Sequence, residues 1–150
     1  MKAAQYDSWY DSPLGLACLE AEITLLRWGA GDLKGKTLLD VGCGTGRFLL
    51  ALGQEASRAV GIDRDAAMLD FARSHTPADM AQRVEWIKSD AAALPFLDGT
   101  FDLVIENTLL CFCHDPMSVI REMVRVCRPG GRILLGELNP SSALAVVAAA

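Results

Sequence analysis

Three glycines at alternating positions mark the segment with the clearest chemical potential. Gly42, Gly44 and Gly46 follow the apolar run 38–41, and a helical pattern follows them. Glycine lets a backbone approach a ligand where a Cβ atom would collide, and the following helix directs free N–H groups at that ligand. The spacing is not the GxGxxG of dinucleotide sites, because Arg47 stands where the third glycine would fall, and there is no GK[ST] ending of a phosphate loop. Taken alone, the glycines are also compatible with a simple tight turn.

Two acidic residues narrow the class of ligand. Asp40 lies near the end of the first apolar run, where a carboxylate can accept from an ammonium group and would repel a phosphate. About 20 residues further on, Asp63 ends a second apolar run, at the spacing where an acid bonds the hydroxyls of a ribose. The glycines and the two acids together indicate a ligand that carries an adenosine and a positive charge.

Four separated motifs, in the same order, resemble those of the class I S-adenosylmethionine-dependent methyltransferases. The similarity is greatest to the small-molecule group that includes the quinone-biosynthesis enzymes, and it extends from about Tyr6 to Asn139. The motifs are residues 38–46, 61–69, 89–96 with 101–104, and 128–131. This resemblance implies S-adenosylmethionine as the cofactor.

The resemblance also implies roles for residues near the methionine and ribose parts of that cofactor. Gly42, Gly44 and Gly46 would line these parts. Asp40 would approach the amino group through backbone or water, and Asp63 would bind the ribose hydroxyls.

The adenine and the methyl group would be held by residues further along the chain. Arg64 and Met68 would flank the adenine, and Asp90 would accept from its exocyclic amine beside the Ala91 backbone. Asn107, after the fourth strand, would lie near the methionine end and the methyl acceptor. Two alternatives stay open: Met68 as a core residue of its helix, and Arg64 as a solvated surface residue.

The start of the chain, residues 6–15, resembles the aromatic segment that closes over the cofactor in this family, with Tyr10 as the candidate lid residue. The alternative is that Trp9 and Tyr10 only pack against the sheet. The loop 109–116 departs from the family, because it carries cysteines at 111 and 113 in the stretch where many relatives carry histidines. No catalytic base can therefore be assigned.

Short apolar strands alternate with helical segments, which predicts an α/β fold with a doubly wound, mostly parallel, Rossmann-like sheet. The resemblance implies the strand order 3-2-1-4-5. The expected strands are 37–41, 58–62, 84–87, 101–106 and 132–138, and the expected helices are 13–28, 45–54, 65–74, 115–127 and one from 139 through the alanine-rich end. Residues 128–131 read as a turn.

The end of the chain predicts an open sheet edge. Family members usually continue past the fifth strand through a helix and an antiparallel strand pair, and we expect that pair to be missing here because the chain stops at Ala150. An apolar, unpaired edge at residues 132–138 is a template for another chain. We therefore expect a homodimer joined near this edge.

Composition sets the broad class. With 150 residues, 51% hydrophobic and 22% charged, the chain predicts a single cofactor-binding domain spanning residues 1–150. A formal charge of -5 without a basic stripe disfavours nucleic acid. The longest apolar run, residues 143–150, is far shorter than the roughly 20 residues of a membrane span. With no apolar signal segment at the start, we expect no membrane association and a cytoplasmic protein.

Five cysteines without a CxxC pair predict reduced structural thiols. Cys111, Cys113 and His114 form a weak candidate cluster, but Cys111 and Cys113 would share one strand face while His114 points to the other, and a fourth ligand is not evident. We therefore expect no metal.

The leading functional hypothesis is methyl transfer from S-adenosylmethionine to a small-molecule acceptor. Alignment and desolvation carry much of the rate of such an in-line displacement, so a dedicated base is not obligatory. The alternative is a non-catalytic protein of the same fold that binds S-adenosylmethionine or S-adenosylhomocysteine. An NAD-type oxidoreductase is disfavoured by Arg47. The sequence does not identify the acceptor.

Overall fold

A six-stranded sheet forms the centre of the computed structural model, which describes residues 2–139 and 142–149. Its spatial order is β3-β2-β1-β4-β5-β6, with the first five strands parallel and β6 antiparallel to β5. The strands are β1 (Thr37–Val41), β2 (Arg58–Asp63), β3 (Val84–Lys88), β4 (Phe101–Asn107), β5 (Cys127–Asn139) and β6 (Ser142–Ala149). The predicted α/β fold and the order 3-2-1-4-5 are confirmed.

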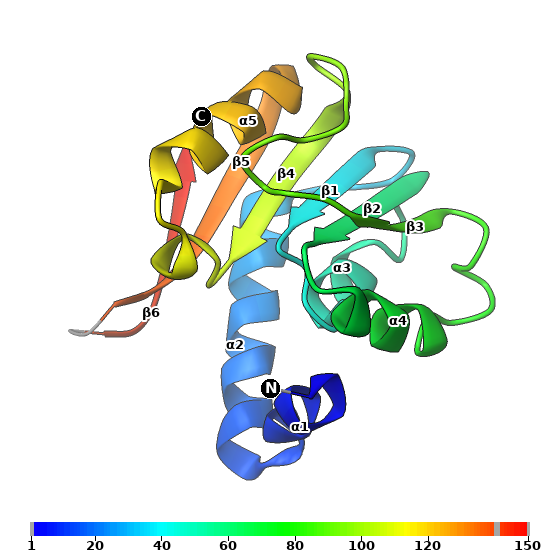
Figure 1. Ribbon diagram of the computed structural model, residues 1–150, viewed down its shortest axis with the longest axis vertical. Helices are drawn as coiled ribbons and strands as arrows, with labels where there is room; N and C mark the ends of the chain where they lie inside the picture. Colours follow the sequence, from blue (N-terminus) through cyan, green and yellow to red (C-terminus); the bar gives the residue numbers. More distant parts are fainter. Residues whose placement is uncertain (1, 140–141, 150) are drawn as a thin grey trace.

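Helices cover both faces of this sheet, with α2 behind it and α5 in front of it in Figure 1. The α-helices are α1 (Ala3–Asp7), α2 (Pro13–Ala30), α3 (Arg47–Leu52), α4 (Ala66–Ser74) and α5 (Pro116–Val126), and the short 3-10 helices are η1 (Ser8–Asp11) and η2 (Leu110–Phe112). The sheet has one hydrophobic core on each face, and neighbouring residues of β1 belong to different ones. Leu38 belongs to the core that includes Leu26 of α2, and Leu39 to the core that includes Met123 of α5. Because both faces are buried, the strand is apolar except at Thr37, where it begins, and at Asp40.

Side-chain caps fix where the helices begin. Ser12 accepts a hydrogen bond from the Gly15 amide at 3.0 Å at the start of α2. Asp115 accepts from the Ser118 amide at 3.2 Å, and Pro116 occupies the first turn of α5, as the sequence predicted. These two caps fix the first turns of α2 and α5.

The C-terminal segment differs from the prediction. Instead of a final helix, residues 142–149 form β6, which pairs with β5 in the register Ile133↔Ala149 to Asn139↔Ser142. Alanine is the strongest helix former, but helix propensity is easily overridden by tertiary context, and the open edge of β5 offers a row of unpaired backbone groups. One antiparallel strand is therefore present where we expected the pair to be missing. The edge on which the dimer prediction rested is occupied by the chain itself.

The expected turn at residues 128–131 lies within β5 as an interruption of its pairing. The register with β4 changes from Phe101↔Cys127 to Leu103↔Arg132, so the intervening residues project from the ladder. Gly130 takes a φ of 75° there, which a side chain would disfavour. The turn chemistry was thus identified correctly, although the strand begins earlier than predicted.

No helix among the described residues is long and apolar enough to cross a membrane.

Candidate functional site

The glycine turn connects β1 to α3 at the carboxyl end of the sheet. Gly42, Gly44 and Gly46 have φ values of 77°, 52° and 83°, a region that side chains disfavour. The amides of Gly42 and Cys43 both donate to the Ile62 carbonyl, at 2.8 and 2.9 Å. The turn is therefore held against the end of β2, as a cofactor-binding turn requires.

The three glycines face different surroundings. A Cβ atom at Gly46 would collide with the Trp86 ring, and one at Gly42 would lie 2.8 Å from Leu109 Cδ1. At Gly44 the nearest atom would be Tyr6 Cε1 at 3.8 Å. Gly46 is thus required by packing, whereas Gly44 leaves open space under Tyr6 into which a ligand can approach the backbone.

Asp63 joins the end of β2 to the glycine turn. Its Oδ2 accepts from the Gly44 amide and its Oδ1 from the Asp65 amide, each at 2.9 Å. The side chain is half-buried, and each carboxylate oxygen keeps a further lone pair. Asp63 can therefore accept from a diol while it fixes Gly44.

Asp40 lies deeper than a ligand contact would require. It is 2% exposed, and its Oδ2 has no hydrogen-bond partner among the described residues. Burial, together with the carboxylates of Glu106 and Asp63, raises the pKa of Asp40 to about 8. Any contact between Asp40 and a ligand must be indirect, through backbone or water, because the carboxyl lies beneath the surface.

A cavity of about 310 Å³ lies beside Asp63, and this volume is at the lower end of the range of small-molecule sites. Five of the residues proposed from the sequence line its wall: Gly42, Asp63, Arg64, Asp90 and Ala91. The opposite wall is formed by the loop after β4 and the start of α5, including Leu109, Phe112, Cys113, His114 and Asp115. The cavity thus joins the ends of β2 and β3 to the loop that follows β4.

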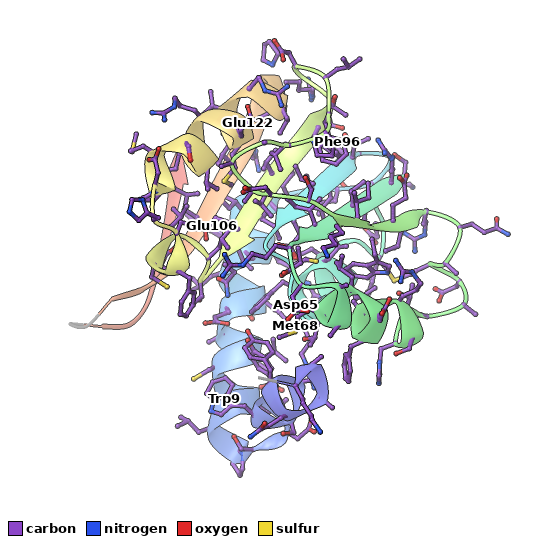
Figure 2. All side chains as sticks on the ribbon, viewed as in Figure 1. Trp9, Asp65, Met68, Phe96, Glu106 and Glu122 are labelled. Carbon is purple, nitrogen blue, oxygen red and sulfur yellow. The ribbon has the colours of Figure 1, made fainter. Side chains whose placement is uncertain are left out.

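Other candidate residues lie outside this cavity wall. Met68 is half-buried on α4, near Asp65 and facing the N-terminal helices in Figure 2. Asn107 Nδ2 lies 3.5 Å from Glu22 Oε2, on the face of the sheet that α2 covers. The candidate lid residue Tyr10 is buried, with its ring packed edge-on against Phe48. Tyr6, one turn earlier, is the aromatic side chain nearest to the open side of Gly44.

The N-terminal segment is fastened to the glycine turn by Arg47, the first residue of α3. Its guanidinium donates to both oxygens of Asp7, at 2.7 and 2.6 Å, and to Asp11 at 3.3 Å. The same group lies 5.2 Å from the centre of the Tyr10 ring. Arg47 stands where a dinucleotide fingerprint would have its third glycine. Here it holds the aromatic N-terminal segment in place and thereby positions Tyr6.

The sequence patterns did not single out two buried glutamates. Glu106, labelled in Figure 2, lies near the end of β4 and is fully buried, and Glu22 on α2 is 8% exposed. The available signal was a charged residue inside the apolar run 103–106, which a strand covered on both faces does not tolerate without a reason.

Comparisons with known proteins agree with this geometry. The model of the methyltransferase domain family matches residues 39–135. A demethylmenaquinone methyltransferase of Lactococcus lactis is 34% identical over 112 residues, covering 73% of this chain and 44% of the relative. The chain spans less than half the length of the curated relatives that it matches.

Solved structures show the same fold. The [4+2]-cyclase SpnF has a TM-score of 0.73 and 30% identity, covering 78% of this chain and 44% of the cyclase. A SAM-dependent methyltransferase of Aquifex aeolicus has a TM-score of 0.74 at 23% identity, covering 91% of this chain and 73% of that one. The glycine turn, the acid at the end of β2 and the family match over most of the sheet lead to one conclusion: the chain belongs to the methyltransferase domain family, in its class I S-adenosylmethionine-dependent form.

Proposed function

We propose that this protein transfers the methyl group of S-adenosylmethionine to a small-molecule acceptor. The observation that carries the proposal is the Asp63 carboxylate, which binds the Gly44 amide at 2.9 Å and faces the cavity with lone pairs to spare. An acid in this position can accept from a ribose diol, and the open side of Gly44 admits the chain that leads from the ribose to the sulfur. The residues therefore fit the cofactor that the family implies.

Four of the proposed contacts follow from the positions of residues that line the cavity. Asp63 would hold the ribose, and Asp90 with the Ala91 backbone would meet the adenine, since all three line one cavity. Arg64 lies on the same wall and would cover one side of the adenine. The remaining proposed contacts are Asp40, Gly42, Gly44, Gly46, Met68, Tyr10 and Asn107.

S-adenosylmethionine supplies an activated methyl on its sulfonium. The chain supplies alignment and exclusion of water: Tyr6 covers the glycine turn, and the loop after β4 covers the adenine side. Such positioning can account for a large part of the rate of a displacement reaction.

The cyclase SpnF suggests a second candidate. A relative of the same fold at 30% identity is a cyclase, and folds host chemistries that the fold does not dictate. A protein that binds S-adenosylmethionine or S-adenosylhomocysteine without methyl transfer is therefore the alternative.

If the protein transfers a methyl group, the name of the Lactococcus lactis relative favours a quinone-like, apolar acceptor. The apolar cavity residues Leu109 and Phe112 are compatible with that class.

Titration calorimetry with S-adenosylmethionine, followed by a methyl-transfer screen with radiolabelled cofactor and small apolar acceptors, tests both candidates. Binding with transfer supports the proposal, and binding without transfer to any acceptor supports the alternative. Absence of binding would contradict both.

The cellular setting is proposed on the same basis. We infer that the protein has no nucleic-acid partner, because the net charge is -5 and no basic stripe occurs in the sequence, and a cytoplasmic location stays a prediction. A homodimer stays a prediction that sedimentation equilibrium tests, and β6 rather than β5 would form the contact if the sheet edge is used.

A further inference from the structure

The loop after β4 forms one wall of the proposed cofactor cavity. It begins at Thr108, a β-branched residue with a φ of 60°, and continues through η2 to Cys113. A β-branched residue rarely adopts this conformation, so the neighbouring contacts must impose it. Thr108 donates its amide to the Gly136 carbonyl of β5 at 2.6 Å. We call residues Thr108–Cys113 the β4 loop.

Two glutamates hold the β4 loop from below. Glu106 Oε2 accepts from the Leu109 amide at 3.1 Å, and Glu137 Oε1 accepts from the Leu110 amide at 2.8 Å. Leu109 itself lines the cavity and lies against Gly42 of the glycine turn. The two carboxyls thus position Leu109, the residue of the β4 loop that lines the cavity and contacts the glycine turn.

One oxygen of this arrangement lacks a partner. Glu106 is fully buried, and its Oε1 accepts no hydrogen bond from the part of the chain that the structure describes. A buried carboxylate with an unpaired oxygen is costly, but a protonated one can donate to a neighbouring carboxylate. Glu137 is that neighbour, and burial together with the Glu137 carboxylate raises the pKa of Glu106 to about 7.

We propose that Glu106 and Glu137 share one proton, and that this proton holds the β4 loop closed against the cofactor cavity. Both are positioning residues, because the loop rather than either carboxyl forms the cavity wall. The assignment of the cavity to the cofactor rests on the proposed function. The shared proton itself rests on the buried Glu106, the half-buried Glu137 and their contacts with two consecutive loop amides.

The neighbouring groups do not replace the proton. Three further titratable groups lie near Glu106 and Glu137: Asp40 on β1 and the thiols of Cys111 and Cys113 in the loop. None of them is a base, and Asp40 is a further acid. Arg64 acts on Cys113 from across the cavity, and no described hydrogen bond or ion pair joins a basic residue to Glu106 or Glu137. Ionisation of both carboxyls therefore leaves two adjacent negative charges under the loop.

The sign of the pH effect follows from the direction of the pKa shift. The closed loop binds the proton more tightly than an open loop, in which Glu106 would titrate near its ordinary value of about 4.3. Closure is thus most stable below about pH 4, weakens as the pH rises to about 7, and levels off above that. The closing equilibrium changes by up to about tenfold for each pH unit in this window.

Amide hydrogen exchange of Leu109 and Leu110 between pH 5 and 8 tests the shared proton directly. After correction for the intrinsic exchange rate, protection of both amides in the wild type should fall from pH 5 to 7 and then remain constant. In Glu106→Gln, the side-chain N–H of the glutamine can donate to Glu137 at any pH, and its side-chain oxygen can accept from the Leu109 amide. Protection of the Leu109 and Leu110 amides in this variant should therefore stay high and independent of pH. The exposed Glu55→Gln serves as the control and should follow the wild type.

Two results would overturn the shared proton: no pH dependence in the wild type, or an unchanged dependence in Glu106→Gln. If Glu106→Gln fails to fold, Glu137→Gln tests the same point, because its amide donates to Glu106 while its oxygen accepts from Leu110.

Binding of S-adenosylhomocysteine at pH 7.5 separates this proposal from the proposed function. Glu106→Gln should bind it several-fold more tightly than the wild type, because its loop is already closed. Unchanged binding would overturn the link between loop and cavity. If neither the wild type nor Glu106→Gln binds S-adenosylhomocysteine while amide exchange depends on pH as expected, the proposed cofactor is refuted. The proposed shared proton is then still supported.

Discussion

Replacing Asp63 by alanine tests the junction between β2 and the glycine turn. The change removes two hydrogen bonds to backbone amides, from Gly44 and from Asp65, each 2.9 Å long. A hydrogen bond to a charged acceptor contributes about 1.5–3 kcal/mol, and the half-buried position lets water replace part of each. We expect the free energy of unfolding of the cofactor-free protein to fall by about 2–3 kcal/mol, which corresponds to about 4–10 °C in melting temperature.

The same substitution should weaken S-adenosylmethionine binding by about 10–150-fold, since the charged acceptor for the ribose is lost. Urea unfolding measures the first effect and titration calorimetry the second. Asp70→Ala is the control, because Asp70 only pairs with Arg73 on the exposed side of α4 and should change stability by less than about 0.5 kcal/mol. Unchanged stability of Asp63→Ala would refute the role of its two amide contacts, and an unchanged dissociation constant would place the ribose elsewhere.

Three further predictions concern the residues around this junction. Gly44→Val should abolish measurable cofactor binding in calorimetry, because its side chain enters the space under Tyr6 and strains a φ of 52°; wild-type affinity would contradict the cleft assignment. Arg47→Ala should release the N-terminal segment by removing its bonds to Asp7 and Asp11, so that limited proteolysis cleaves within residues 1–12 several-fold faster, whereas an unchanged cleavage rate would show that the aromatic packing suffices. Asp40, whose pKa burial raises to about 8, favours folding when protonated; its contribution to stability should therefore decline as pH rises from about 4 to 8, at up to about 1.4 kcal/mol for each pH unit, and Asp40→Asn should remove that contribution and leave the smaller decline due to Glu106 in urea titrations.

The sequence alone predicted those features of the protein that depend on residues close together along the chain. The strand 37–41 and the glycines after it were predicted because a short, mostly apolar run and the GxGxG spacing are local patterns. Asp115-Pro116 predicted the start of α5 for the same reason, since a cap and a first-turn proline act within four residues. The residues Asp63, Arg64, Asp90 and Ala91 were predicted to share a site, and they line one cavity because parallel strands end at the same edge.

The tertiary structure decided what depends on partners distant in sequence. Residues 142–149 form a strand rather than a helix because the edge of β5 offers backbone partners that no local propensity records. Tyr6 rather than Tyr10 faces Gly44, because Arg47 fixes the N-terminal segment from forty residues away. Glu106 and Glu137 meet under the β4 loop for a similar reason: β4 and β5 are adjacent in the sheet, and burial then makes a proton part of the structure.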